Sequence, residues 1–337
     1  MGSRAGAERK PKTLSEAVPI YRTALVELYH RDCFDWLRVR EEHSIHAVVT
    51  DPPYGLIEYE ESNLQKLEAG RGGVWRIPPK LDGYQRAPLP RFTVQTHEEL
   101  TAMTLFFTDW AKLVFKVLVP GGHVVIATNP LLSTRLYNAI LSAGFESRGE
   151  FIRLVTTLRG GDRPKNAHDE FEDVTVMPKS NFEPWGMFRK PIAFKTVAAN
   201  LRVWRAGGFR RVGKDAPFGD VYRCPPANVE ERKLANFPTL KPQRLMRHLV
   251  QSVLPLGDGI VLDTFAGSGS TLAAAEAVRY HAIGLERRAD YARLAAGAIP
   301  RLAAYKPPEA DGNGKNGKRP RSEVEETEAD RQIRLEL

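Results

Sequence analysis

The stretch Val261-Leu262-Asp263-Thr264-Phe265-Ala266-Gly267-Ser268-Gly269-Ser270-Thr271 is a short apolar strand that runs into a glycine turn and then into a helix. In doubly wound sheets, ligands bind beyond the carboxyl ends of the strands, where the strand order reverses. Gly267 and Gly269 have no side chains, so the backbone can approach a ligand closely at this turn. The turn lacks the Gly-Lys-Ser/Thr ending of a phosphate-binding loop, which argues against a nucleoside triphosphate.

The strand that follows, Ala282-Ile283-Gly284-Leu285-Glu286, ends on a carboxylate. Glu286 comes about 20 residues after the glycine turn, which is where an acidic residue binds ribose hydroxyls in this kind of sheet. A solvated carboxylate at a strand end is the plainer alternative. The spacing favours a nucleoside-containing ligand.

Strands alternate with helices along the rest of the chain. The apolar periodicity predicts strands over 24–29, 45–50, 123–127, 145–158 (one or two strands), 259–263 and 282–286, and helices over 34–40, 97–118, 132–143, 242–254, 270–280 and 289–303. Pro120-Gly121-Gly122 is expected to stop the helix before it, while 55–95 and 159–236 show little periodicity. This alternation predicts an α/β fold with a doubly wound, mostly parallel sheet.

Length and composition describe an ordinary globular protein with a basic surface. The chain has 337 residues, 42% of them hydrophobic and 27% charged, and a formal net charge of +8. That charge suits a polyanionic partner but is equally consistent with a solvated basic surface. Cys33 and Cys224 are too few for a disulfide framework, which favours a reducing cytoplasm. No apolar stretch approaches the roughly 18 residues of a membrane span, and the N-terminus lacks a signal-peptide core.

A second motif lies about two hundred residues before the glycine turn. Asp51-Pro52-Pro53-Tyr54 follows the apolar run Ile45–Thr50 and so stands where a buried strand reaches the surface. These residue types suit a flat, nitrogen-bearing ring, because a carboxylate accepts N–H bonds, prolines fix the backbone and an aromatic ring stacks.

The two motifs together resemble S-adenosylmethionine-dependent DNA methyltransferases that modify exocyclic amino groups. The aromatic-acid motif comes first and the Phe-x-Gly-x-Gly motif late, an order similar to the circularly permuted beta group of that family. Four further segments resemble the group, namely Leu28–Cys33, Leu118–Gly122, Glu183–Pro191 (near the target pocket) and Phe237–Pro242. The family often has His where this chain has Phe237, which puts that cofactor contact in question. The resemblance covers roughly residues 25 to 303 and implies a Rossmann-like methyltransferase fold.

The resemblance implies direct methyl transfer from S-adenosylmethionine to the amine of a base that has left the duplex. The Asp51 carboxylate and the Pro52 carbonyl would accept the two amine N–H bonds, and Tyr54 would stack on the base. Asp at position 51 favours adenine N6, whereas cytosine-N4 enzymes more commonly have Ser. RNA or protein-glutamine methylation, usually associated with Asn at this position, and a catalytically silent DNA-binding module are weaker alternatives.

The site residues that the resemblance implies fall into two groups. The catalytic residues are Asp51, Pro52, Pro53 and Tyr54. The cofactor-binding residues are Asp32, Cys33, Asp51, Thr239, Lys241, Asp263, Phe265, Ala266, Gly267, Ser268, Gly269, Ser270, Thr271, Glu286 and Arg287. No cysteine nucleophile is required, and the scattered histidines predict no metal site.

The family places a target-recognition insert in the region of 192–235. We therefore expect the chain to divide into a leader (1–20), a catalytic half (21–191, with a mobile loop at 56–95), the insert (192–235), a cofactor-binding half (236–305) and a disordered tail (306–337). Basic residues suit phosphate contacts, and the DNA-binding residues predicted are Arg189, Lys190, Arg202, Arg205, Arg210 and Arg211. The expected partner is double-stranded DNA in a prokaryotic, nucleoid-associated setting. A homodimer and a separately encoded restriction endonuclease are left open.

Overall fold

The computed structural model describes residues 18–57, 60–69, 75–76, 89–90, 92, 95–157, 164, 167, 169–178 and 180–308. Most of the predicted leader, most of the tail and much of loop 56–95 therefore lie outside the described residues. The chain up to Tyr305 forms one compact unit, and of the residues after it only 306–308 are described. None of the described helices is long and apolar enough to cross a membrane.

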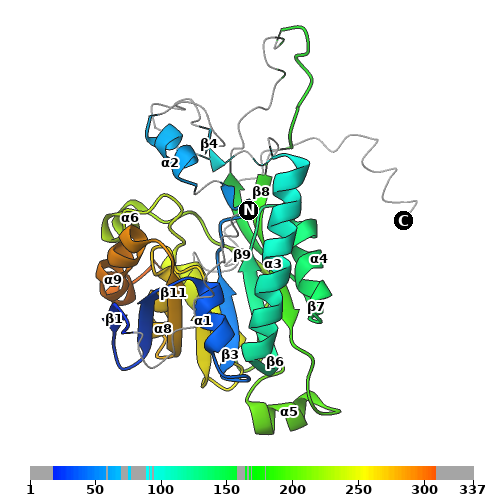
Figure 1. Ribbon diagram of the computed structural model, residues 1–337, viewed down its shortest axis with the longest axis vertical. Coiled ribbons are helices and arrows are strands. Elements are labelled where there is room, and N and C mark those ends of the chain that lie inside the picture. Colours follow the sequence, from blue (N-terminus) through cyan, green and yellow to red (C-terminus); the bar gives the residue numbers. More distant parts are fainter. Residues whose placement is uncertain are drawn as a thin grey trace, which may run out of the picture. The chain divides into compact units, whose positions relative to one another are not determined.

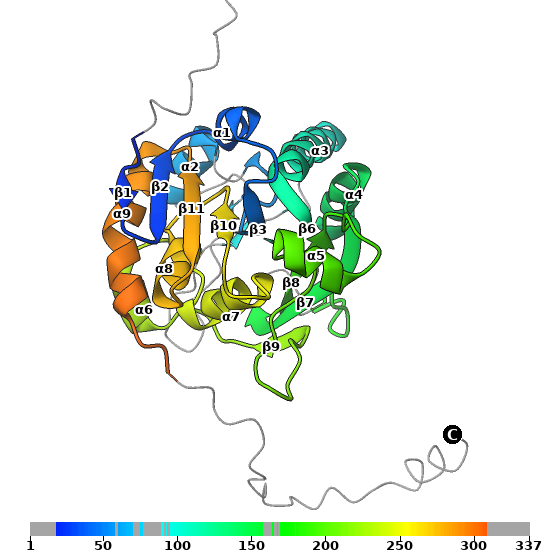
Figure 2. The same cartoon turned by 90° about the horizontal axis from the view of Figure 1, so that it is seen from below.

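The core of the described chain is a nine-stranded sheet with the order β1-β2-β11-β10-β3-β6-β8-β7-β9 (Figures 1 and 2). The strands from β2 to β6 run parallel to one another, whereas β8 is antiparallel to both β6 and β7. In spatial order the strands are β1 (Tyr21–Arg22), β2 (Val26–His30), β11 (His281–Glu286), β10 (Ile260–Asp263), β3 (Ile45–Thr50), β6 (Leu118–Ala127), β8 (Ser180–Arg189), β7 (Glu146–Thr157) and β9 (Val221–Arg223). The predicted doubly wound α/β sheet is confirmed, and its outer third is mixed.

Helices cover both faces of this sheet. One face carries α1 (Cys33–Val39), α3 (His97–Val117) and α4 (Ser133–Ser142), and the other carries α7 (Gln243–Val253), α8 (Ser270–Ala277) and α9 (Ala289–Ala304) (Figure 2). Strand β3 shows why its sequence is apolar throughout. Ala47 and Val49 pack into the core under α7–α9, while Ile45 and Val48 pack into the core under α1, α3 and α4. A strand buried on both faces cannot alternate apolar with polar residues.

Helix α3 forms where its sequence predicts it. Thr96 and Glu99 make a capping box at its start, and the buried Phe107, Trp110 and Val114 recur at helical spacing along one side. Each such fully buried large side chain contributes about 1.5–3 kcal/mol by leaving water. The helix ends at Val117 rather than at the Pro-Gly-Gly segment, because β6 already begins at Leu118.

Several elements differ from the sequence predictions. The predicted one or two strands over 145–158 are a single strand, β7 (Glu146–Thr157), which is irregular around Gly149. The segments that seemed to lack periodicity contain the ten-residue strand β8, the helices α2 (Glu61–Glu68), α5 (Val197–Trp204) and α6 (Val229–Leu234), and the short pair β4 (Trp75–Arg76) and β5 (Leu89–Pro90). The helices are too short for a periodic pattern to stand out, although the Asn228–Glu231 capping box of α6 was readable.

Candidate active site at the carboxyl edge of the sheet

The two sequence motifs meet at the switch point of the sheet. From β10 the chain passes through α8 to β11 on one side, and from β3 it passes through α3 to β6 on the other side and the opposite face. Strands β10 and β3 are parallel neighbours, with Leu262 opposite Val48. Figure 2 shows the two strands side by side. Their carboxyl ends are therefore neighbours, which places Asp51 and the glycine turn at one edge of the sheet.

A buried hydrogen bond joins the two strand ends. The Thr50 Oγ1 hydroxyl donates to Asp263 Oδ1 at 2.7 Å, and the same oxygen accepts from the Phe265 backbone N–H at 3.1 Å. Burial raises the pKa of Asp263 to about 6, against the donors that face it. Asp263 thus links the strand that leads into Asp51–Tyr54 to the glycine turn.

The side chains of Asp51 and Tyr54 belong to a buried polar network. The Tyr54 hydroxyl lies 2.8 Å from Asp51 Oδ1 and 3.1 Å from Glu183 Oε1, so its single proton can serve either carboxylate. Lys241 Nζ lies 2.6 Å from Asp51 Oδ2 and 3.0 Å from Glu183 Oε1. Arg153 Nη1 donates to the other oxygen of Glu183 at 2.7 Å. Two carboxylates and two cations are balanced here at the carboxyl edge.

Burial and charge set the protonation of this network. Burial raises the pKa of Asp51, and the Lys241 ammonium opposes that rise. Burial alone would raise the pKa of Glu183, but the charges of Lys241 and Arg153 outweigh it and lower this pKa to about 2. Burial, with the two carboxylates, raises the pKa of Tyr54, so its hydroxyl remains a donor. Glu183 is therefore a permanent carboxylate beside Asp51.

The rest of the tetrapeptide is held by packing. Pro52 is buried, and Pro53 and Tyr54 are half-buried. The Tyr54 ring packs against Phe92 with centroids 6.1 Å apart, and Gln95 donates to the Gly55 carbonyl at 3.0 Å. These contacts fix the chain direction after Asp51.

The glycine turn faces Glu286, as the spacing predicted. Glu286 accepts the backbone N–H of Gly267 at 2.9 Å and that of Arg288 at 2.8 Å, and burial raises its pKa. Gly267 has a φ of +50°, and a Cβ at this position would lie 3.3 Å from the Phe237 ring. Gly269 (φ +80°) approaches Ile299 of α9, where a Cβ would lie at 2.6 Å. Both glycines are required by the backbone and by neighbouring side chains.

The remaining predicted cofactor residues surround this turn or lie beneath it. Asp32 caps α1 by accepting from the Phe34 N–H at 2.8 Å, and the Arg31 N–H donates to the Glu286 carbonyl at 2.9 Å. The aromatic side chains of Phe265 and Phe237 lie on the two flanks of the turn, in contact with Trp110 and Tyr291 respectively. The other members are the buried Cys33, Ala266, Ser268, Ser270 and Thr271, the half-buried Thr239 and the exposed Arg287.

This set of residues fits an adenosine-containing cation. Glu286 offers carboxylate oxygens for hydroxyl donors, Gly267 leaves the backbone bare, and the carboxylate of Asp51 lies at the neighbouring strand end. Cys33 is not a nucleophile in this setting, because burial raises the pKa of its thiol to about 12. Burial also raises the pKa of Cys224, which is almost completely inaccessible.

Lys241 lies elsewhere than its predicted role implies. Its ammonium contacts Asp51 and Glu183 and lies over the Tyr54 ring, so it belongs to the network around Asp51. Its contact with the cofactor stays a prediction. Glu183 and Arg153 were missed as individual residues, since a single Glu and a single Arg on strands carry no motif. The resemblance of Glu183–Pro191 to a strand near the target pocket was the available signal.

The predicted DNA-binding residues lie at the opposite, amino-terminal edge of the parallel strands. Lys190 Nζ donates to the carbonyls of Phe115 and Leu118, just before β6, at 2.6 and 2.8 Å. Arg205 pairs with Asp258, which precedes β10, at 2.9 Å. Helix α5, which carries Arg202, lies at the far end of the molecule from α2 in Figure 1 and nearest the viewer in Figure 2.

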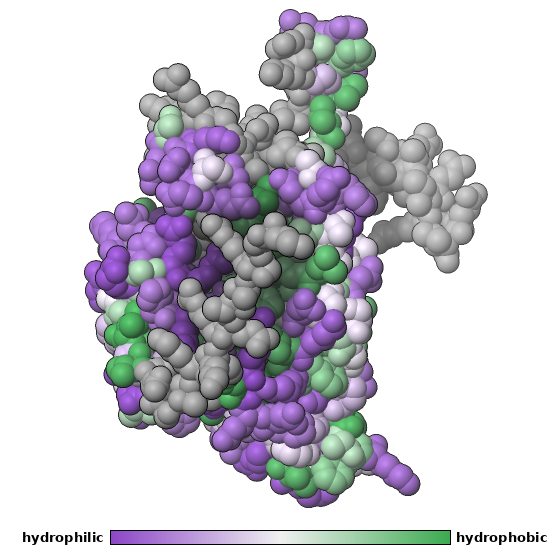
Figure 3. Space-filling view, viewed as in Figure 1, coloured by the Kyte–Doolittle hydropathy of each residue, from purple (hydrophilic) through white to green (hydrophobic). Residues whose placement is uncertain are grey.

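Two more of these basic side chains, those of Arg189 and Arg211, have structural partners. Arg189 is 9% exposed, pairs with Glu146 at 2.7 Å and donates to the Gly207 carbonyl at 3.0 Å. The backbone N–H of Arg210 donates to Ser252 at the end of α7, and Arg211 donates to the Lys214 carbonyl. The end of the molecule around α5 also exposes the apolar Phe194, Val197 and Val203 (Figure 3). DNA contact by these residues stays a prediction.

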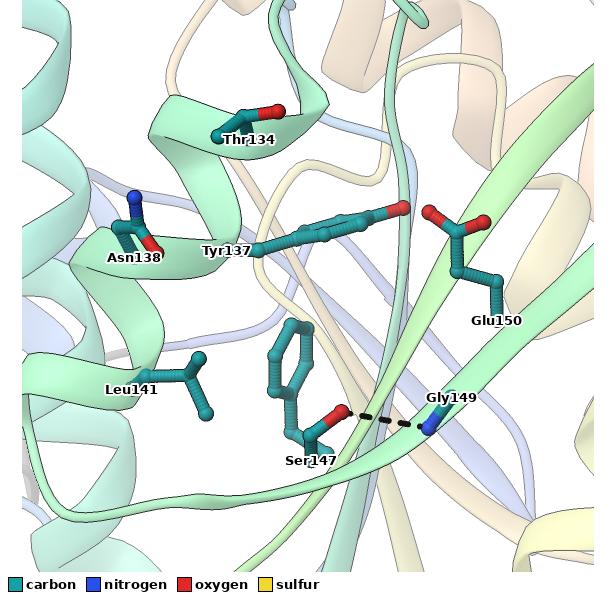
Figure 4. Close-up of a pocket in the computed structure, with 8 residues that line it drawn as sticks. Thr134, Tyr137, Asn138, Leu141, Ser147, Gly149 and Glu150 are labelled. Carbon is teal, nitrogen blue, oxygen red and sulfur yellow. Dashed lines mark hydrogen bonds between the residues drawn. The ribbon is translucent and has the colours of Figure 1, made fainter.

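A separate hollow of about 330 Å³ lies between α4 and the β7–β8 pair (Figure 4). Tyr137 points across it towards Glu150, and Thr134, Asn138 and Leu141 line its helical side. Gly186 makes room for the Tyr137 ring, since a Cβ there would lie 2.5 Å from it. None of the residues lining this hollow belongs to the network around Asp51.

Comparison with known proteins agrees with this geometry. Residues 45–297 match the DNA methylase family of N6 and N4 type. The chain is 25% identical over 283 residues to the type II methyltransferase M.HindIII of Haemophilus influenzae, covering 77% of this chain and 90% of that protein. It is 26% identical over 262 residues to the type II methyltransferase M.MjaI of Methanocaldococcus jannaschii, covering 73% and 82%.

Solved structures share the fold. The PvuII DNA methyltransferase (cytosine-N4-specific) superposes with a TM-score of 0.57 at 18% identity, covering 85% of this chain and 93% of that chain. TTHA0409 of Thermus thermophilus, crystallised with S-adenosyl-L-methionine, superposes with a TM-score of 0.51 at 22% identity, covering 82% and 95%.

The fold and the paired strand-end motifs define an α/β methyltransferase. The chain belongs to the DNA methylase family of the N6-adenine or N4-cytosine type. Its methyl donor, as in this family, is S-adenosylmethionine.

Proposed function

We propose that the protein transfers a methyl group from S-adenosylmethionine to the N6 amine of an adenine that has left the DNA duplex. The observation that carries this proposal is the place of Asp51 at the carboxyl end of β3, directly beside the glycine turn that follows β10. A carboxylate at this point can accept an N–H bond from an aromatic amine while the methyl donor lies at the next strand end.

The residues of the tetrapeptide would divide the work. The Asp51 carboxylate and the Pro52 carbonyl accept the two amine N–H bonds, which fixes the nitrogen and makes it more nucleophilic. The Tyr54 ring offers a face for the base, a contact of roughly 1–3 kcal/mol by analogy with other base–aromatic stacking. Bound S-adenosylmethionine supplies a methyl group on a positively charged sulfur. After transfer the amine carries an extra proton, and the Asp51 carboxylate is the nearest chain group that can accept it.

Glu286 and the glycine turn would hold the cofactor. Glu286 is fixed by two backbone N–H bonds, and each of its oxygens keeps a lone pair for a ribose hydroxyl. Gly267 lets the backbone approach, and Phe237 takes the place of the histidine that the family often has. Asp32 lies at the end of β2, next to β11, where it can contact the far end of the nucleoside.

The test is incubation with isotope-labelled S-adenosylmethionine and plasmid DNA, followed by mass spectrometry of the nucleosides. N6-methyladenine is the expected product, and N4-methylcytosine would reassign the target base. Asp51→Ala should reduce transfer by at least about a hundredfold while cofactor affinity changes little, because a positioned acid–base group commonly contributes 10²–10⁴-fold. Unchanged turnover in this variant would refute the pocket.

The relatives named type II methyltransferases also motivate a biological role. We infer that the protein is the modification enzyme of a restriction–modification pair whose endonuclease is a separate chain. DNA from cells that express it should become resistant to cleavage at the methylated sequence. Unprotected DNA carrying the modified base would argue against this role.

A further inference from the structure

The network around Asp51 has one arrangement that the methyl-transfer scheme does not explain. Both oxygens of Asp51 already hold donors, namely the Tyr54 hydroxyl on Oδ1 and the Lys241 ammonium on Oδ2. These are the atoms that the base amine must reach. The side chains are largely enclosed, with 21% of Asp51 and 11% of Lys241 exposed, so water is a poor substitute partner for either.

Glu183 lies within hydrogen-bond distance of both groups that donate to Asp51. Its Oε1 lies 3.0 Å from Lys241 Nζ and 3.1 Å from the Tyr54 hydroxyl, so each donor can move to Glu183 with little displacement. The Lys241 ammonium already makes a charge-assisted bond to Glu183, and the Tyr54 hydroxyl can exchange its bond to Asp51 for one of the same kind to Glu183. Glu183 Oε1 therefore contacts both groups that bond Asp51 and can hold them when Asp51 takes another partner.

Arg153 holds the carboxylate of Glu183 in place. Its guanidinium donates to Glu183 Oε2 at 2.7 Å, to the Cys224 carbonyl at 2.9 Å and to the Pro225 carbonyl at 2.8 Å. Arg153 is only 5% exposed and sits opposite Glu183 in the β7–β8 register. A guanidinium held by three acceptors keeps its planar fork in place.

We propose that Glu183, fixed by Arg153, is a positioning residue of the base site, which takes the Lys241 ammonium and the Tyr54 hydroxyl from Asp51 when the base amine arrives. Asp51 is then free to accept the amine N–H bonds. This inference rests on the proposed amine transfer, and it adds a residue from the antiparallel part of the sheet to the site. No covalent step is involved.

Two neutral variants should behave in opposite ways. In Glu183→Gln the ammonium keeps only one charged partner, so it stays on Asp51 and competes with the amine. The single-turnover rate at saturating DNA and cofactor should fall by about tenfold or more, the range of a lost bond to a charged group. In Lys241→Gln the competitor is absent, so adding Glu183→Gln to this variant should lower its rate much less than Glu183→Gln lowers the rate of wild type. The double variant should recover most of the rate that Glu183→Gln loses.

The methyl-transfer rate is expected to fall on the acid side, where Asp51 becomes protonated. The pH of this fall, called the acid limb here, is a readout that simple destabilisation of the protein would not move. Asp51 faces Lys241 from the segment before α7, Glu183 from β8 with Arg153 behind it, Tyr54 on its own loop and Asp263 at the end of β10. Removing the positive charge of Lys241 should shift the limb to higher pH, because protonated Asp51 becomes more stable. Removing the negative charge of Glu183 should shift the limb to lower pH.

The experiment measures single-turnover transfer to plasmid DNA across pH 5.5–9 for wild type, both single variants and the double variant. Glu150→Gln is the matched control, because this exposed carboxylate on β7 faces Tyr137 and makes no contact with the network (Figure 4). S-adenosylmethionine affinity and the melting temperature report folding. Should Glu183→Gln fail to fold, the Lys241→Gln profile alone decides the inference.

Three results would overturn it. One is a Glu183→Gln rate equal to wild type, another is a double variant as slow as Glu183→Gln, and the third is a Lys241→Gln protein that fails at every pH because it no longer binds cofactor. A wild-type protein that methylates no DNA amine would instead refute the proposed function, so the two failures are distinguishable.

Discussion

Asp263→Asn should stabilise the protein at neutral pH, even though the aspartate belongs to the glycine-turn motif. Asp263 is 3% exposed, and burial raises its pKa from 3.8 to about 6. The protonated carboxyl is thus favoured in the folded state. Its stabilising effect is complete below the unfolded pKa and is lost as the pH rises through the folded value. Asparagine keeps the acceptor for Thr50 and the Phe265 N–H and carries no charge at any pH.

The size of the effect follows from the gap of about two pH units, which corresponds to roughly 3 kcal/mol. Linkage gives a gain for the variant of about 1 kcal/mol at pH 4.5 that grows to about 3 kcal/mol above pH 7. At about 2 °C for each kcal/mol in a chain of this size, the melting temperature should rise by roughly 2 °C and 6 °C respectively.

Thermal unfolding of the cofactor-free protein between pH 4.5 and pH 8 measures this difference directly. Asp109→Asn is the matched control, because it removes the same charge from an exposed pair with Lys112 that contributes little to stability. The reasoning fails if Asp263→Asn melts below wild type at pH 8. It also fails if the difference between the two proteins does not change with pH, because the Asp263 carboxylate would then be ionised and well satisfied.

Two further outcomes follow from the placement of side chains. Glu286→Gln should weaken S-adenosylmethionine binding by about tenfold, since a charged acceptor for hydroxyls is lost; calorimetric titration checks it, and a loss confined to DNA affinity would contradict the ribose assignment. The double variant Arg202→Glu with Arg211→Glu should change DNA affinity less than about threefold at moderate salt, because both residues lie at the edge away from Asp51; a fluorescence titration that shows a large loss and a flatter salt dependence would restore them as phosphate contacts.

The long, regular elements were predictable because the spacing of their apolar residues follows from which side chains are buried. Strand β3 is apolar throughout because it is covered on both faces, and α3 repeats its buried residues at helical spacing. The strand β8 was recognised only from Glu183 to Pro191. The start of this strand carries the exposed Asn181 and Phe182 and then Glu183, where an apolar alternation would be expected, and the strand pairs antiparallel with two neighbours. Pairing direction depends on the partners that a strand meets, which local pattern does not encode.

The site was predictable where a motif carries a geometric requirement and unpredictable where it depends on pairing across the sheet. Gly267, Gly269 and Glu286 are fixed by turn geometry and spacing, and the structure brings them together. Glu183 and Arg153 meet only because β7 and β8 pair in one register. The basic insert was placed by family order, but its first part turns to the amino edge of the sheet, where Arg205 pairs with Asp258, and its later part returns to Arg153, which donates to the Cys224 and Pro225 carbonyls.

The two halves of the site differ in how firmly the backbone holds them. Asp51 and the glycine turn leave neighbouring parallel strands, and the bond from Thr50 to Asp263 joins those strands at their last residues. In the proposed reaction, this one hydrogen-bonded ladder would position both the methyl donor and the base amine, which suits a reaction in which a 1 Å misplacement can lower the rate by about a hundredfold. Lys241 comes instead from the segment before α7 and is held only by side-chain contacts. In the proposed reaction, the two strand ends would hold the reacting atoms in place, and the Lys241 ammonium would move beside them so that Asp51 releases its oxygens to the base.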